Sequence, residues 1–304
     1  MEELSYIKNR FDKLFELDDL EKDPSFCKHF KNTYSKVDFK WESFFTREYL
    51  NKYNGLMIRG YNEINNIFGA VFPTEEVIDT FVKKSQKGDL LFLHHPVDIE
   101  NGDPRGKLGR GFLPISKRNL KLIKKNELSI YACHAPLDYN TEIGTGVAIA
   151  NSLNANIEEH FFPYGNGFGG LICSIKSVST EKLNKIVKDI FKIPYIDFAG
   201  KEHDRIEKIA IVAGTGGIVS ILSEVEEKGV QAFITGEVFS YIDNDYGKSL
   251  RKEIKEYIPK TNMSLIGVSH AASEYLVIKT LLRDWIIEKL KVEYKLIPQS
   301  KWWR

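Results

Sequence analysis

The segment Leu90–Pro96 constrains the fold of this chain most strongly. Four apolar residues run directly into His94, His95 and a proline. A helical pattern that includes Val77 and Phe81 precedes this run and ends at a Lys-Gly-Asp turn. A helix, a glycine turn and a short continuous apolar run indicate a buried strand of an α/β sheet. Proline cannot donate to a sheet ladder, so the strand should leave two imidazoles at its carboxyl end, where open α/β sheets place their sites.

The composition excludes several classes of protein. The chain has 304 residues, enough to bury a large core in one big domain or two lobes. Its net charge is only +1, so we expect no nucleic-acid partner. The longest apolar runs are of strand length, far below the roughly 18 residues that span a bilayer, and the acidic start lacks the layout of a signal peptide. We therefore expect no membrane partner and a cytoplasmic location. The three cysteines are widely spaced and fit neither a disulfide framework nor a thiolate zinc site.

The pattern along the chain predicts four segments. Residues 1–50 form a charged, aromatic-rich helical extension, expected to pack onto the main body and to carry no chemistry. Residues 51–153 and 206–304 alternate strands with helices, which indicates a first and a second α/β lobe. Residues 154–205 form a connecting segment between them. Residues 98–118 are rich in glycine, proline and charge, and we expect a loop there.

Polar residues that can bind a metal or move a proton follow four predicted strands. They are His94 and His95, then His134 with Asp138, then Glu237, and finally His270 with Glu274. Four of the seven histidines thus directly follow a strand, which a randomly solvated surface is not expected to produce. A single histidine after a strand is more often structural, and we interpret His29, His160 and His203, which lack this setting, as structural or exposed.

The last of these groups opens a long amphipathic helix, predicted to run to Leu290. His270 and Glu274 are four residues apart at its start, so both side chains can face one point. Imidazole and carboxylate donors without thiolates suit zinc, iron, manganese, cobalt or nickel. Two such ions roughly 3.5–4 Å apart, joined by a bridging carboxylate, clamp a hydrolysed substrate and lower the pKa of a bound water.

Two other motifs allow different chemistry. Gly214-Thr215-Gly216-Gly217 lies between a predicted strand and helix and could bind a dinucleotide, with Glu237 at the distance of a ribose-binding acid. The fingerprint is incomplete because Val219 stands at its third glycine, and a tight turn between strand and helix is the preferred interpretation. Cys133 beside His134 could suggest a nucleophile pair, but neighbours on a strand point to opposite faces, which favours a core cysteine.

Taken together, these motifs resemble one family. His-His-Pro after an apolar strand, His-x-x-x-Asp, a glycine-rich turn, Thr-Gly-Glu and Ser-His-x-x-Ser-Glu are similar to the Nif-three-like proteins, also named GTP cyclohydrolase I type II homologues. The resemblance covers roughly residues 54–297. It implies an α/β protein with two similar lobes around a central cleft, a dinuclear metal site between the lobes, and assembly into a toroidal homohexamer.

The resemblance also implies residue roles. Five residues would hold the two divalent ions: His95 and Asp138 one ion, His94 and His270 the other, and Glu274 both. His134 would orient a ligand or act in acid–base chemistry, and Glu237 would line the same cleft.

The chain departs from the family pattern at two positions. The family commonly has an Asp-Asn pair before its early Gly-Leu strand, where this chain has Tyr53-Asn54. Its last motif commonly begins Gly-His, where this chain has Ser269 before His270. Neither departure removes an expected ligand.

Two functions follow from this pattern. The first is a metal-dependent hydrolase in which a metal-bound hydroxide attacks a small substrate, and the family name suggests a nucleotide such as GTP. The second is a metal-stabilised oligomeric scaffold or regulatory interaction protein without catalysis. A nucleotide-cofactor oxidoreductase would need the complete glycine fingerprint.

Overall fold

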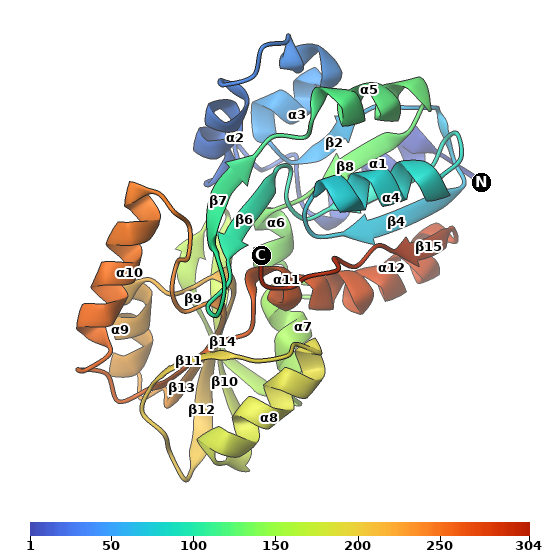
Figure 1. Cartoon of the computed structure of the whole chain (residues 1–304). Helices are drawn as coiled ribbons and strands as arrows, with labels where there is room; N and C mark the ends of the chain where they lie inside the picture. The colour runs from blue at the N-terminus through green and yellow to red at the C-terminus, as the bar shows by residue number, and fades with distance from the viewer. The chain divides into compact units, whose positions relative to one another are not determined.

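The computed structural model describes residues 1–304 and divides the chain into two compact units. Unit 1 comprises Met1–Ile99, Phe112–Asn140 and Val277–Ser300. Unit 2 comprises Glu100–Gly111, Thr141–Leu276 and Lys301–Arg304. Each unit is built around its own sheet (Figure 1), as the predicted alternation of strands and helices requires.

Unit 1 contains a five-stranded sheet in the order β15-β4-β5-β8-β2. Its strands are β2 (Gly55–Ile58), β4 (Asn66–Ala70), β5 (Leu90–Leu93), β8 (Ser129–Ala132) and β15 (Glu293–Leu296). The first four strands in the sheet order are parallel to their neighbours, and only β2 is antiparallel. A mostly parallel sheet is buried on both faces, which explains why β5 is apolar at every position.

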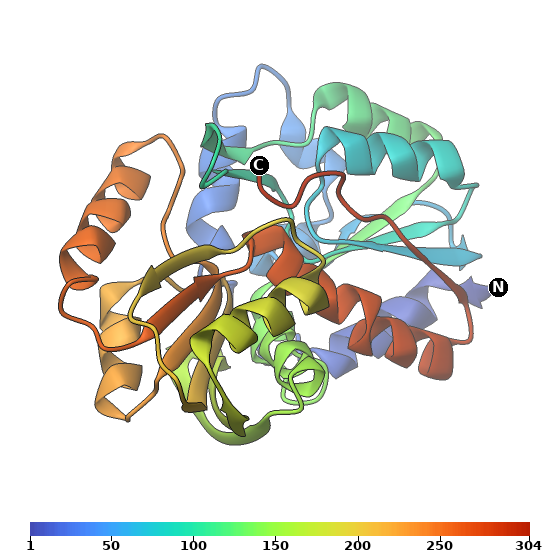
Figure 2. The same cartoon turned by 60° about the horizontal axis from the view of Figure 1, so that its bottom comes forward.

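Helices cover both faces of this sheet. The helices of unit 1 are α1 (Leu4–Leu14), α2 (Phe26–Tyr34), α3 (Arg47–Lys52), α4 (Glu75–Lys84), α5 (Lys117–Lys125), α6 (Ala135–Tyr139) and α12 (Leu281–Leu290), with a 3-10 turn at Trp41–Phe44. Two short strands, β1 (Glu2–Glu3) and β3 (Glu63–Ile64), pair in antiparallel orientation and hold the first residues against the rest of unit 1. In Figures 1 and 2, α4 and α5 lie on one face and α1 and α12 on the other.

The N-terminal helix α1 is part of the core of unit 1. The ring of Phe11 is fully buried, with its centroid 5.3 Å from that of Phe92 on β5 and 4.9 Å from that of Tyr131 on β8. Trp285 of α12 stacks on the same ring at 5.7 Å. Aromatic contacts of this kind add to the free energy of area burial, so residues 1–14 stabilise the sheet directly.

Unit 2 contains a six-stranded sheet in the order β11-β14-β13-β12-β10-β9. Its strands are β9 (Asn156–Tyr164), β10 (Gly167–Val178), β11 (Asp197–Gly200), β12 (Ile206–Thr215), β13 (Ala232–Glu237) and β14 (Ser264–Gly267). The three central strands β12, β13 and β14 are parallel, whereas β9, β10 and β11 are antiparallel to their neighbours.

Helices again lie on both faces of this second sheet. They are α7 (Thr145–Ser152), α8 (Thr180–Phe191), α9 (Val219–Glu227) and α10 (Asp245–Tyr257), and α11 (His270–Lys279) begins directly after β14. Figure 2 shows α9 and α10 on one face and α7 and α8 on the other. The face under α9 and α10 forms a buried apolar cluster that includes Leu222, Phe233, Ile254 and Leu265.

The predicted helix and strand around the His-His motif are confirmed, and side-chain caps explain where the helices begin. The predicted helix before the His-His strand is α4, and the Thr74 hydroxyl accepts a hydrogen bond from the Val77 amide at 3.0 Å. The Ser179 hydroxyl caps α8 in the same way through the Lys182 amide. The apolar run at Leu90–Leu93 is the buried strand β5.

Two expectations are wrong. Residues 98–118 are not a loop but contain the paired strands β6 (Asp98–Gly102) and β7 (Leu108–Leu113). The buried positions of β7 are Gly109 and Gly111, so the apolar alternation that signals a strand is absent from the sequence. The single long helix expected through Leu290 is divided at Thr280 into α11 and α12, without a proline or glycine to mark the break.

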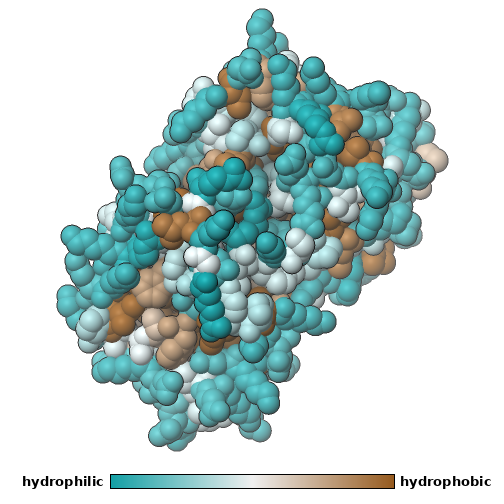
Figure 3. All heavy atoms as spheres, viewed as in Figure 1, coloured by the Kyte–Doolittle hydropathy of each residue, from teal (hydrophilic) through white to brown (hydrophobic).

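Neither the surface in view nor the helices have the apolar character of a membrane-spanning segment. On the face shown in Figure 3, hydrophilic residues predominate and apolar residues occur in small separate groups. No helix has the length and apolar character needed to cross a bilayer.

Replacing Phe11 with alanine should lower the free energy of unfolding by about 3–5 kcal/mol, because it leaves a cavity against the sheet of unit 1. The matched control is Tyr6→Ala on the same helix, where the side chain is 41% exposed and we expect a change within about 0.5 kcal/mol. Urea unfolding followed by tryptophan fluorescence measures both, since Trp285 contacts the Phe11 ring. Equal effects of the two substitutions would show that α1 is peripheral.

Candidate metal centre

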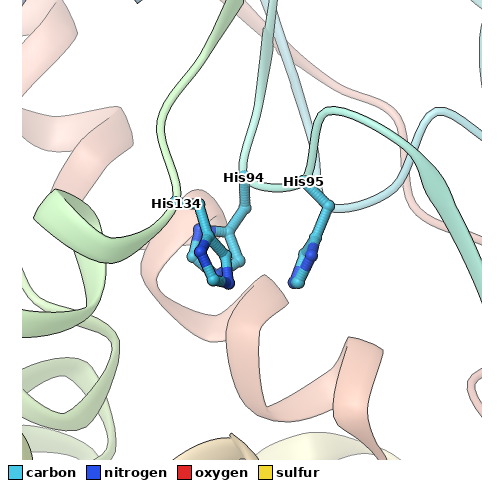
Figure 4. A group of neighbouring side chains, drawn as sticks. All are labelled: His94, His95 and His134. Carbon is cyan, nitrogen blue, oxygen red and sulfur yellow. The ribbon is translucent and has the colours of Figure 1, made fainter. Parts of the chain in front are cut away.

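Three histidines of unit 1 converge at one edge of its sheet. His94 and His95 directly follow β5, and His134 follows β8 after Cys133. Strands β5 and β8 are parallel neighbours, with Leu93 paired to Ala132, so their carboxyl ends lie side by side. One ring nitrogen from each of the three imidazoles lies within 4.8 Å of the other two, and all three residues are buried. Figure 4 shows the three rings pointing the same way from these two strand ends.

The hydrogen bond of His94 fixes its tautomer. Its Nδ1 lies 3.0 Å from the carbonyl oxygen of Cys133, which can only accept, so Nδ1 carries the proton and donates. In the neutral ring Nε2 then presents a lone pair. Helix α6 places Asp138 Oδ1 3.4 Å from that Nε2.

This pair of donors fits a metal ion. Two lone pairs that face each other are stabilised by a cation between them. In tetrahedral coordination, with metal–ligand bonds of about 2.0–2.2 Å, two ligand atoms lie about 3.3–3.6 Å apart, which includes the observed 3.4 Å between Nε2 and Oδ1. The same carboxylate extends toward His134, with its Oδ2 3.8 Å from His134 Nε2. Nitrogen and oxygen donors without thiolate sulfur suit borderline divalent ions.

A second group of donors lies in unit 2, where α11 begins. His270 Nε2 is 2.9 Å from Glu274 Oε1, so the spacing of four residues brings both side chains to one point, as predicted. On the other side of the ring, Nδ1 is 2.5 Å from Glu237 Oε1 at the end of β13. Asn101 Nδ2 lies 3.2 Å from the same ring nitrogen. Burial alone would lower the pKa of His270, but the two glutamates outweigh it and raise this pKa to about 10.

The glycine turn after β12 lies against this second group. Gly214 has a φ of +65°, and a Cβ atom there would lie 2.5 Å from Glu274 Oε1. Its amide donates to the Ser273 hydroxyl at 3.0 Å. A Cβ at Gly216 would lie 2.6 Å from the Thr235 hydroxyl. These contacts agree with the interpretation of a tight turn. A side chain at Gly214 would require the Glu274 carboxylate to move and would strain the positive φ.

Comparison with known proteins gives the family. A model of Duf34/NIF3 (NGG1p interacting factor 3) matches residues 41–301. The chain belongs to the Duf34/NIF3 family. A "GTP cyclohydrolase 1 type 2 homolog" of Pyrococcus horikoshii is 30% identical over 234 residues, which cover 75% of this chain and 82% of that protein. A protein of the same name from Archaeoglobus fulgidus is 28% identical over 243 residues, with coverage of 79% and 86%.

Solved structures share the fold. "Structural genomics, protein ybgI, unknown function" superposes with a TM-score of 0.67 at 17% identity and covers 99% of both chains. "Reduced HcgD from Methanocaldococcus jannaschii" gives a TM-score of 0.59 at 23% identity, with coverage of 84% of this chain and 93% of that one. The resemblance inferred from the motifs is thereby confirmed, as is a mixed α/β NIF3 fold with two sheets.

Ser269 lies at a strained position, where the motif resemblance leads us to expect glycine. Its φ is +75°, a left-handed conformation that favours glycine over every residue with a Cβ. The Ser269 hydroxyl donates to the carbonyl oxygen of Trp302 at 2.5 Å. A hydrogen bond to the C-terminal residues therefore supports a strained backbone directly before His270.

Asp23 contacts the candidate site, and sequence reasoning missed this contact. We expected no chemistry from residues 1–50, yet this segment contains a buried carboxyl beside His134. The Asp23 side chain is fully buried, and Oδ2 lies 3.1 Å from His134 Nδ1. Nothing near Asp23 in the sequence signals this contact, because the two residues are 111 positions apart.

The other histidines and Cys133 have structural surroundings. Cys133 is fully buried, and burial, with the nearby charges of Asp23 and Asp138, raises the pKa of its thiol well above the usual value, which agrees with a core role. His29 stacks on Phe112 with ring centroids 4.4 Å apart. His160 is exposed on β9, and the amide of His203 donates to the Thr180 hydroxyl.

Unit 2 contains a further buried carboxyl group, that of Asp197 on β11. Its Oδ2 accepts a hydrogen bond from the Tyr241 hydroxyl at 3.0 Å. Burial raises the pKa of Asp197 to about 6, against the lowering effect of the Tyr241 hydrogen bond, and the charge of Glu237 adds to the increase. Asp197 therefore retains its proton in the folded chain at pH values where the unfolded chain has lost it.

We expect Ser269→Gly to be more stable than Ser269→Ala by about 1–2 kcal/mol, because only glycine adopts the positive φ without cost. Both variants lack the hydroxyl, so their difference isolates the backbone strain from the hydrogen bond to Trp302. Thermal unfolding of the two proteins at one pH is the measurement. Equal stabilities would mean that residue 269 is not in the left-handed conformation.

Replacing Asp197 with asparagine should flatten the pH dependence of stability. A carboxyl with a raised folded pKa binds its proton more tightly in the folded state, so wild-type stability falls as pH rises from about 4 to 6. Asp197→Asn should remove this fall and stabilise the protein at pH 7 by on the order of 1–3 kcal/mol. Urea unfolding from pH 4 to 7 measures it, with the exposed Asp189→Asn as control. Parallel pH profiles for wild type and Asp197→Asn would contradict the expectation.

Proposed function

We propose that this chain is a hydrolase that depends on two divalent metal ions and acts on a small substrate. The observation that carries the proposal is the convergence of three buried imidazoles, with ring nitrogens within 4.8 Å, at the carboxyl ends of two parallel strands. Buried polar groups of this kind are costly unless they have partners, and a fold retains them where they bind or react.

The proposed ligands follow the assignment that the resemblance implies. His95 and Asp138 would hold one ion, His94 and His270 would hold the second, and Glu274 would be a ligand of both. Their donor chemistry supports this set, since all are imidazole nitrogens or carboxylate oxygens. When bound, a metal pair lowers the pKa of a coordinated water and polarises the substrate atom under attack.

Two further residues of this chain have roles beside the ions. Glu237 Oε1 accepts from His270 Nδ1 and so keeps His270 Nε2 directed at Glu274. His134 has its Nε2 near Asp138 and is the proposed proton acceptor and donor during hydrolysis. The rings of His94 and His95 lie beside it, with centroids 5.1 and 4.8 Å from that of His134, and all three residues are buried.

A nucleotide is the first substrate class to test. The relatives from Pyrococcus horikoshii and Archaeoglobus fulgidus carry the name GTP cyclohydrolase 1 type 2 homolog, which suggests opening of a purine ring. The same machinery also hydrolyses phosphoesters and amides. Assembly into a toroidal homohexamer is proposed on the resemblance alone.

We expect purified protein to contain two transition-metal ions per chain by elemental analysis, and His94→Ala to lose at least one of them. Hydrolysis across a panel of GTP, other nucleotides, phosphoesters and amides should fall at least about 100-fold in this variant. Any oligomer detected by light scattering should persist, since His94 is fully buried and presents no surface to another copy of the chain. His160→Ala, on the exposed face of β9, is the control for metal content and rate.

Two results would contradict the proposal. A protein that contains no transition metal, and takes none up from zinc, iron, manganese, cobalt or nickel, is not a metal-dependent hydrolase. The metal-stabilised scaffold would be the better description under two conditions. His94→Ala would have to dissociate the oligomer, and the wild-type protein would have to turn over no substrate of the panel.

A further inference from the structure

Asp23 is a buried carboxylate that lies outside residues 41–301, the part of the chain that the family model matches. It precedes α2 in the N-terminal segment. Its Oδ1 accepts from the Phe26 amide at 2.8 Å, and its Oδ2 accepts from the Ala135 amide at 3.1 Å. The residue therefore joins the start of α2 to the segment that carries His134.

Asn54 completes this arrangement. Its Nδ2 donates to Asp23 Oδ2 at 3.1 Å, while its Oδ1 accepts from the His134 amide at 2.7 Å. The carboxylate beside Asn54 is supplied by Asp23, 31 positions away in the sequence.

The carboxylate also determines how His134 is protonated. His134 Nδ1 lies 3.1 Å from Oδ2 and 3.3 Å from Oδ1 of Asp23. Burial alone would raise the pKa of Asp23, but the His134 ring and the amides of Phe26 and Ala135 outweigh it and hold this pKa well below its usual value. Both Asp23 oxygens already accept from N–H groups, those of Ser25 and Phe26 at Oδ1 and those of Asn54 and Ala135 at Oδ2. The carboxylate therefore acts as an acceptor, and His134 Nδ1 is the donor.

We propose that Asp23 is a positioning residue that fixes His134 in the Nδ1-protonated tautomer and directs its Nε2 lone pair toward His94, His95 and Asp138. The proposal deepens the proposed function, on which the catalytic consequence rests. The N-terminal segment contributes a second contact, since the Phe26 ring stands edge-on to the His134 ring with centroids 4.6 Å apart. Together, Asp23 and Phe26 hold the imidazole in one orientation.

The catalytic step balances as a simple proton transfer. As water attacks the substrate, its O–H bond breaks and the proton forms a new N–H bond at His134 Nε2. The ring becomes an imidazolium whose positive charge faces the Asp23 carboxylate. The same proton then passes to the leaving group, and His134 returns to its neutral Nδ1-protonated form.

The simpler explanation is that Asp23 only anchors the N-terminal segment. The variant Asp23→Asn distinguishes this anchoring role from the proposed positioning of His134. Asparagine keeps an oxygen for the Phe26 amide but places an NH₂ group where Oδ2 accepts from His134. Because the remaining oxygen is held by the Ser25 and Phe26 amides, we expect His134 to accept from this NH₂ group at Nδ1 and to carry its proton at Nε2. A purely structural role would leave the tautomer unchanged.

The first measurement is the ¹⁵N spectrum of the histidine rings in metal-free protein, with His134 assigned through loss of its signals in His134→Gln. Wild type and the exposed control Asp18→Asn should show the Nδ1-protonated form. Asp23→Asn should show the Nε2-protonated form. A wild-type His134 protonated at Nε2 would overturn the proposal, even if Asp23→Asn failed to fold.

The second measurement is steady-state hydrolysis with the metal-loaded protein. Asp23→Asn should lower kcat by about 10²–10⁴-fold with little change in KM, and Asp18→Asn should leave both unchanged. If Asp23→Asn changed the tautomer but the wild type hydrolysed nothing, the proposed function would fail while the positioning role held. If folded Asp23→Asn showed an unchanged tautomer and an unchanged kcat, Asp23 would have only a structural role and the proposal would be wrong.

Discussion

Parallel strands deliver their carboxyl ends to a single edge of a sheet, and the chemistry of this chain depends on that constraint. In unit 1, the pairing of β5 with β8 brings His94 and His95 beside His134. In unit 2, the pairing of β12, β13 and β14 brings the glycine turn, Glu237 and His270 together. Helices on both faces keep each sheet buried, so the strand ends remain as the places for polar groups.

The imidazoles of His94, His134 and His270 are held in the same way. In each, Nδ1 faces a group that accepts a hydrogen bond: the Cys133 carbonyl for His94, Asp23 for His134 and Glu237 for His270. Each Nε2 then points at a carboxylate oxygen, of Asp138 or of Glu274. Fixing the outer nitrogen in this way sets the inner nitrogen for binding a cation or a proton.

Much of this arrangement could be predicted because its signals are local. The strand β5, the helix α4 before it, and the spacing of His270 and Glu274 are each encoded within a few residues. The strand β7 was missed because glycines occupy its buried positions, and the break between α11 and α12 carries no local marker. The contact of Asp23 with His134 is the opposite case, since only the packing of α2 reveals it.

The C-terminal residues give the ligand loop a remote support. The carbonyl of Trp302 accepts from Ser269, and the carbonyl of Arg304 accepts from the Gly102 amide, one residue after Asn101, which contacts His270. Trimming the last four residues would remove both acceptors without altering any proposed ligand. Trp302 and Arg304 are therefore positions at which engineering can loosen the loop before His270 while its donor atoms remain chemically intact.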